Sequence, residues 1–82
     1  MNKLLVEVYI PTIGKAYDVL IPSKAKVYEL TPLISAAIKR LSDGLFIADD
    51  ATLCDELKGT IYRNNMSVEE MGLRNGSRIM LI

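Results

Sequence analysis

The chain has 82 residues, 50% of them hydrophobic, and its ten basic and ten acidic residues give a formal net charge of zero. This length predicts a single small domain over residues 1–82, and the charge balance excludes the basic surface typical of a nucleic-acid-binding protein. One cysteine, Cys54, and no histidine exclude an internal disulfide and the usual zinc and iron–sulfur ligand sets.

The first ten residues lack the features of a signal peptide. Their apolar stretch alternates with polar residues, contains Glu7 and has no cleavage-site pattern. No apolar run approaches the roughly 20 residues that are needed to span a bilayer. We therefore expect a cytoplasmic protein without direct membrane insertion, and the unpaired thiol fits a reducing compartment.

Two strands are predicted at the N-terminus. Apolar side chains alternate over residues 4–10, which is typical of a strand with one buried face. Residues 11–15 supply the chemistry of a turn, in which Gly14 permits a positive φ angle. The alternation resumes over residues 16–21, so the two segments predict a hairpin.

Residues 26–41 show the apolar spacing of a helix. Pro32 lies inside this segment and removes a backbone donor, which leaves two alternatives. We favour one helix that is irregular or kinked near Thr31, while a main helix that starts at Thr31 is the other. Gly44 is a typical helix terminator. The apolar side chains with this helical spacing form a stripe along one face of the predicted helix, and they are Val27, Leu30, Ile34, Ile38 and Leu41, with Leu33 and Ala37 widening the stripe.

The segment after the helix has a weaker pattern. Residues 45–52 predict a loop in which Phe46 or Ile47 packs under the helix. Residues 53–57 then indicate a third strand, and residues 60–62 indicate a small fourth strand.

The C-terminal segment begins with a helix-capping signature. Ser67 and Glu70 have the spacing of a capping box, in which each side chain satisfies a backbone N–H of the first turn. Asn75–Gly76 indicates a turn. Residues 79–82 alternate as a final strand, and its natural partner is the first strand because it has no local one.

This order of elements, ββαββ, then a short helix, then β, is that of an α+β β-grasp fold. In that fold a mixed sheet of four to five strands wraps one main helix. The chain resembles ubiquitin-like proteins over its whole length, and residues 66–82 are the most specific part of the resemblance.

Within that superfamily the chain is similar to the YukD/EsaB-like proteins of bacterial type VII secretion loci. The resemblance rests on the short chain, on the Tyr-Asp-Val-Leu-Ile pattern of Tyr17–Ile21, and on an ending that combines Gly72–Leu73, Asn75–Gly76 and an aliphatic strand. It implies a cytoplasmic accessory or regulatory factor for a membrane machine that exports helical-hairpin substrates of the Trp-x-Gly class. It also implies a protein that is not conjugated to targets.

The sequence has no Gly-Gly after Ile82, where ubiquitin-type modifiers and sulfur carriers react. We therefore expect a non-catalytic binding module. The alternative is a ubiquitin-like modifier or sulfur carrier that is activated at its C-terminus.

No catalytic, cofactor-binding or metal site is predicted. Cys54 has no obvious activating base, and the adjacent Asp55 should raise the pKa of its thiol. Asp49–Asp50 and Asp55–Glu56 could suggest a divalent cation, but paired carboxylates are more often solvated, and such ions take six or more oxygen ligands. The glycines of Gly72-x-x-x-Gly76 belong to turns, because the segment lacks the Lys-Ser/Thr ending of a phosphate loop.

The outer face of the sheet is the predicted partner-binding surface. Because the first and last strands should be neighbours, we expect Leu5, Met80 and Ile82 to lie together. Such an apolar cluster suits a heteromeric contact, such as a cytoplasmic part of a secretion apparatus, or a homodimer. The exposed edge of the second strand is an alternative binding surface. The predicted contact residues are Leu5, Tyr9, Leu20, Met80 and Ile82.

Overall fold

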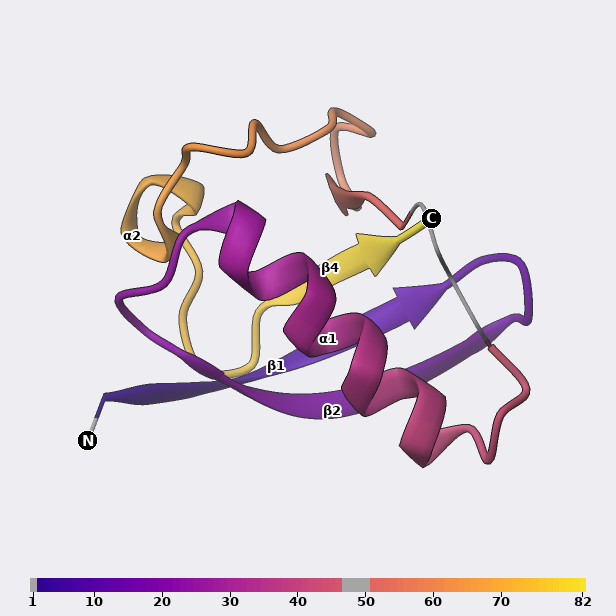
Figure 1. Ribbon diagram of the computed structural model, residues 1–82. Coiled ribbons are helices and arrows are strands. Elements are labelled where there is room, and N and C mark those ends of the chain that lie inside the picture. Colours follow the sequence, from indigo (N-terminus) through magenta and orange to yellow (C-terminus); the bar gives the residue numbers. More distant parts are fainter. Residues whose placement is uncertain (1, 47–50) are drawn as a thin grey trace.

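A four-stranded sheet with one long helix across its face forms the computed structural model, which describes residues 2–46 and 51–82 (Figure 1). The strands lie in the order β2-β1-β4-β3. The elements are β1 (Lys3–Ile10), β2 (Lys15–Pro22), α1 (Val27–Leu41), β3 (Leu53–Asp55), α2 (Val68–Met71) and β4 (Arg78–Leu81).

The first two strands form the predicted hairpin. They pair antiparallel over their whole length, from Lys3 opposite Pro22 to Ile10 opposite Lys15. The turn between them uses Gly14 at a φ of 64°, a conformation that glycine adopts without steric cost. Strand β4 then lies parallel to β1 and antiparallel to β3, so the prediction that the last strand pairs with the first is confirmed.

Helix α1 is continuous from Val27 to Leu41, with Pro32 inside it. The alternative of a main helix starting at Thr31 is therefore wrong. The Thr31 hydroxyl donates to the carbonyl of Val27 at 3.0 Å. The carbonyl that loses its donor to Pro32 belongs to the exposed Tyr28, where water can replace the missing bond.

The first turn of α1 is held by residues far along the chain. The N–H groups of Val27 and Tyr28 donate to the carbonyls of Met66 and Asn64, at 2.9 and 3.1 Å. The carboxylate of Glu29 accepts the N–H of Lys26 at 2.9 Å. Four N–H groups at a helix start lack partners within the helix. The segment before α2 supplies carbonyl acceptors for two of these groups in α1.

The predicted third and fourth strands are shorter than expected. Strand β3 ends at Asp55, and residues 60–62 contribute only an isolated bridge between Ile61 and Cys54. The Asp55 carboxylate accepts the N–H groups of Leu57 and Lys58, at 2.9 and 3.3 Å. This side-chain turn takes the chain out of the sheet after Asp55, because it competes with strand pairing.

One apolar core lies between the sheet and α1. Phe46 is buried in it as predicted, whereas Ile47 lies outside the described residues. Leu33 and Leu41, which were assigned to the buried stripe of the helix, are about half exposed. The residues of α1 that are buried are Val27, Leu30, Ile34 and Ile38.

Candidate partner-binding surface

The face of the sheet opposite α1 is built from alternate residues of the strands. Successive side chains of a strand point to opposite faces, so the burial of Val6 and Val8 beneath α1 turns Leu5, Glu7 and Tyr9 outward. Directly paired residues share a face, and the pairing of β1 with β2 and β4 extends this surface across the sheet. Its composition therefore follows from the register of three strands.

The register separates Leu5 from Met80 and Ile82. Tyr9 is the residue of β1 that lies opposite Met80. Leu5 lies instead beside the turn before β4, where its N–H donates to the side-chain oxygen of Asn75 at 2.8 Å and its carbonyl accepts from Gly76 at 2.7 Å. Four residues along a strand correspond to about 13 Å. The expectation that Leu5, Met80 and Ile82 lie together is thus wrong.

Two apolar patches result, one on each side of the middle of the face. The leucine pair is Leu5 and Leu20, which lie directly opposite each other on β1 and β2 and are 42% and 60% exposed. The Met80 patch groups residues of β1, β4 and the segment after β3. It consists of Tyr9, Ile61, Met80 and Ile82.

A row of charged side chains lies between the two patches. The guanidinium of Arg78 contacts Glu7 at 3.5 Å and Glu56 at 3.3 Å, and Asp18 lies opposite Glu7 on β2. Arg78 also lies 4.8 Å from the centre of the Tyr9 ring, a cation–π contact. Arg78 was missed in the sequence analysis. The available signal was a charge on each of two central strands at positions that face outward.

Cys54 lies beneath the Met80 patch. It is opposite Met80 on one side and bridges to Ile61 on the other, and it is 1% exposed. Burial raises the pKa of its thiol, so the predicted direction is confirmed, but the cause is desolvation and not the charge of Asp55. A protonated, covered thiol is a poor nucleophile.

The other candidate residues have ordinary structural roles. Gly72 and Gly76 adopt positive φ angles of 75° and 89° and belong to turns. Asp55 binds backbone N–H groups in its own turn. Asp49 and Asp50 lie outside the described residues. Over residues 2–46 and 51–82, no cluster of three potential metal-ligating side chains occurs, and none of the helices is long and apolar enough to cross a membrane.

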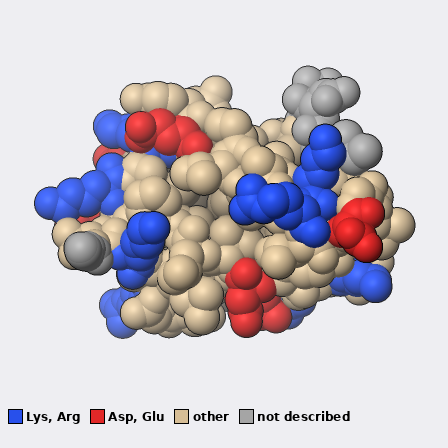
Figure 2. Space-filling view, turned by 60° about the horizontal axis from the view of Figure 1, so that its bottom comes forward, with Lys and Arg blue, Asp and Glu red and all other residues tan. Residues whose placement is uncertain are grey.

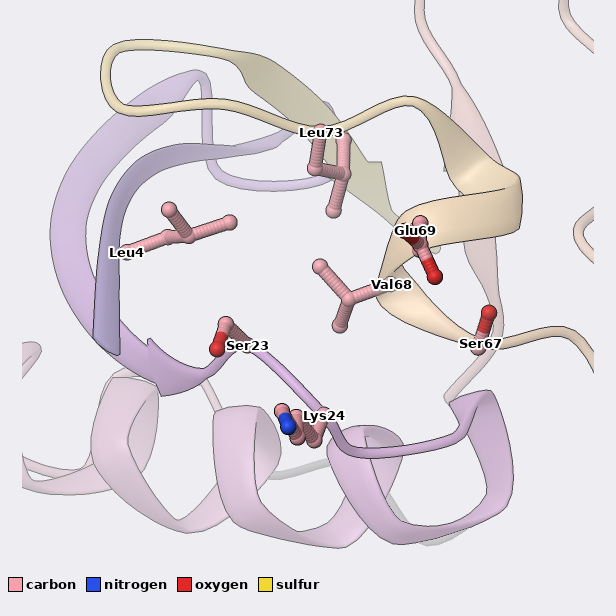
Figure 3. Close-up of a pocket in the computed structure, with 7 residues that line it drawn as sticks. All are labelled: Leu4, Ser23, Lys24, Ser67, Val68, Glu69 and Leu73. Carbon is pink, nitrogen blue, oxygen red and sulfur yellow. The ribbon is translucent and has the colours of Figure 1, made fainter. Parts of the chain in front are cut away.

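A cavity of about 510 Å³ lies between the start of β1, the β2–α1 turn and α2 (Figure 3). Leu4, Val68 and Leu73 point into it from three sides, and polar residues of the β2–α1 turn and of α2 form its rim. Its apolar floor and open mouth suit the side chain of a partner better than a small polar ligand.

Comparison with solved structures relates this architecture to known domains. The ubiquitin-like domain of the Mycobacterium tuberculosis type VII secretion system protein ECCD1 is 15% identical, with a TM-score of 0.78 over 100% of this chain and 99% of that one. The EccD5 ubiquitin-like domain from Mycobacterium xenopi is 19% identical, with a TM-score of 0.72 over 100% and 94%. No protein-family model and no curated protein matches the sequence.

The chain has the ubiquitin-like β-grasp fold. A chain of the toluene 4-monooxygenase HD complex shares the same architecture at 8% identity, with a TM-score of 0.77 over 98% of this chain and 96% of that one. At such identities the likeness establishes the fold, and different proteins use this fold for different tasks. The function must therefore be argued from the surface of this chain.

Proposed function

We propose that this protein is a non-catalytic, ubiquitin-like accessory or regulatory factor of a bacterial type VII secretion system, of the YukD/EsaB kind. It acts in the cytoplasm by binding a cytoplasmic part of the secretion apparatus. The observation that carries the proposal is the likeness of the whole chain to ubiquitin-like domains of two type VII secretion proteins. Because the monooxygenase component has the same fold, this likeness supports the secretion role only together with the surface of this chain.

The Met80 patch is the docking surface in this proposal. Ile61 and Ile82 are 63% and 47% exposed, and Tyr9 and Met80 are half-buried. The patch therefore offers exposed apolar surface to a partner. Burying one such side chain contributes about 1.5–3 kcal/mol before the costs of association. Arg78 borders the patch and lets it discriminate between partners by charge, because exposed charges at a rim contribute more to specificity than to affinity.

The backbone of Ile82, directly after β4, pairs with the segment before β3. The carbonyl of Ile82 accepts the N–H of Thr52 at 2.7 Å, and its N–H donates to Thr52 at 2.9 Å. The carrier alternative predicts a C-terminal adenylate when the protein is incubated with a cognate activating enzyme and ATP, and mass spectrometry would detect it.

Substitution of Met80 tests the proposal. The Met80→Asp variant should lose capture of a type VII apparatus subunit from native cytoplasm and should fail to restore secretion of Trp-x-Gly substrates in a deletion strain. The reason is that a carboxylate in an apolar interface must be desolvated. Leu45→Asp is the matched control, because Leu45 is 58% exposed after the end of α1 and lies off the outer face.

Both variants should retain the circular dichroism spectrum of the wild type. If the wild type captures no apparatus subunit and deletion leaves secretion unchanged, the secretion role is wrong. If Met80→Asp behaves as Leu45→Asp does, the role can stand but the Met80 patch is not its docking surface.

A further inference from the structure

Two carboxylates lie next to each other beside the Met80 patch. Glu7 and Asp18 are directly opposite each other on β1 and β2. The N–H of Glu7 donates to the carbonyl of Ser77 at 2.8 Å, so the backbone groups of Glu7 point toward β4 and away from β2. The two residues therefore form a non-hydrogen-bonded pair, in which the side chains of an antiparallel ladder come closest. Like charges that face each other in this way are destabilising.

The charges around this pair do not neutralise it. Arg78 is shared between Glu7 and Glu56, at 3.5 and 3.3 Å. Asp18 is exposed and forms no ion pair with the rest of the described chain. The charged row therefore has three carboxylates for one guanidinium, and Lys3 lies beyond the leucine pair at the far end of β1. The side of the molecule that β2 borders shows an acidic group at the lower edge of the view, next to uncharged surface (Figure 2).

The Met80 patch begins two residues along the strands from the charged row. Tyr9 follows Glu7 on β1 at this spacing, and Met80 follows Arg78 on β4. Two residues of a strand span about 7 Å, and Ile82 lies about the same distance further along. A ligand that lies along β4 therefore meets apolar, apolar and then acidic surface in steps of about 7 Å.

The form of such a ligand follows from what the face of a sheet offers. Only side chains project from this face, because the backbone groups of the strands lie in the plane of the sheet. A ligand on the face must therefore satisfy its own N–H and carbonyl groups. A helix does so, and its residues at intervals of four lie on one side, about 6 Å apart along the axis. This interval matches the steps of the surface, whereas an extended segment would need the edge of β2.

We propose that the Met80 patch binds an amphipathic helix of its partner that carries a basic side chain one turn away from two apolar side chains. The apolar side chains, four residues apart, cover Met80 and Ile82. The lysine or arginine one turn further along lies against Glu7 and Asp18 and relieves their repulsion. An acidic residue there would add a carboxylate to the row, so the surface selects basic over acidic helices. This inference rests on the docking surface that the proposed function assigns.

Titration of the purified, isotope-labelled protein with designed helical peptides, followed by NMR, tests the proposal. The basic peptide has two leucines four residues apart and an arginine four residues further along, in an alanine and glutamine background. The acidic peptide has glutamate in place of the arginine, and a third peptide has the arginine on the opposite side of the helix. The basic peptide should shift the amide signals of Tyr9, Met80 and Asp18. It should bind at least about tenfold more tightly than either of the others.

Charge reversal in the protein supplies the matched controls. Asp18→Lys leaves two cations and two carboxylates in the row, so the basic and acidic peptides should bind within about threefold of each other. The variant should fold, because Asp18 is exposed and a lysine there faces Glu7. Glu69→Lys makes the same change of net charge on α2, outside the sheet, and should keep the preference of the wild type.

Three results overturn the proposal. They are equal or tighter binding of the acidic peptide or of the third peptide by the wild type, no binding at millimolar concentration, and signal changes confined to β2, which would indicate a strand added at its edge. None of them touches the secretion role, which capture and deletion test. If the basic peptide binds as expected and the wild type captures no apparatus subunit, the helix-binding surface stands and the secretion role is wrong.

Discussion

Arg78 determines how the outer face is divided. Its guanidinium contacts Glu7 on β1 and Glu56 after β3, and it covers the Tyr9 ring. The side chains of Arg78 and Glu7 are 41% and 44% exposed, so water screens their attraction. We infer that Arg78 contributes more to the separation of the two apolar patches than to the stability of the fold.

Replacement of Arg78 by alanine should therefore lower the free energy of unfolding by only about 1 kcal/mol, the sum of weak exposed ion pairs and one cation–π contact. Urea denaturation in low salt measures the loss. In 1 M salt the loss should shrink, because the Debye length falls to about 3 Å. Arg74→Ala is a control at an exposed arginine for which the described residues show no ion pair. A loss above about 3 kcal/mol would contradict a mainly surface role.

At the scale of elements, the short helix α2 supports the start of the long helix. Ser67 precedes α2, accepts the N–H of Glu70 at 3.1 Å, and forms a bridge with Lys26 just before α1. In return the carboxylate of Glu70 accepts the N–H of Ser67 at 2.8 Å, and this bond lowers the pKa of Glu70. The capping box predicted at Ser67 and Glu70 is confirmed, and it stabilises a connection between distant segments.

Ser67→Ala should lower the free energy of unfolding by about 1 kcal/mol, the usual cost of removing an N-cap side chain. Urea denaturation at pH 7 measures it, with Ser35→Ala inside α1 as the control that should be neutral or stabilising. Because the pKa of Glu70 is lowered on folding, its contribution is present above its ordinary pKa and is lost as pH falls through the folded value. An unchanged stability of Ser67→Ala would contradict the cap.

Elements with strong local signals could be predicted from the sequence. Alternation predicted β1 and β2 to within a residue, and the helical spacing predicted α1. The segment after β3 could not be predicted as well, since the turn at Asp55 depends on a side chain that accepts two backbone N–H groups. Leu33 and Leu41 have the spacing of core residues but are exposed, because no element of the described chain covers that flank of α1.

The candidate surface was predicted in composition but not in arrangement. Periodicity correctly identified Leu5, Leu20 and Ile82 as outward-facing and exposed. It did not give the register between β1 and β4, which are far apart in the chain. That register is set by the buried faces and by the turn at Asn75 and Gly76, which bonds to Leu5.

At the scale of the whole molecule, two separate apolar surfaces lie on the same outer face of the sheet. The leucine pair adjoins the open edge of β2, whereas the Met80 patch lies over β4 and the segment after β3. The charged row of Asp18, Glu7, Arg78 and Glu56 separates them. Because of this arrangement, a contact made through the Met80 patch leaves the leucine pair and the edge of β2 exposed.

The distance between the patches predicts that substitutions in them act independently. The change in unfolding free energy of the double variant Leu5→Ala/Met80→Ala should equal the sum of the single changes within about 0.5 kcal/mol, because the two residues are about 13 Å apart. Tyr9→Ala/Met80→Ala is the matched pair of direct neighbours, and it should deviate from additivity by more than that. Coupling between Leu5 and Met80 as large as that between Tyr9 and Met80 would contradict the division of the outer face into two energetically separate patches.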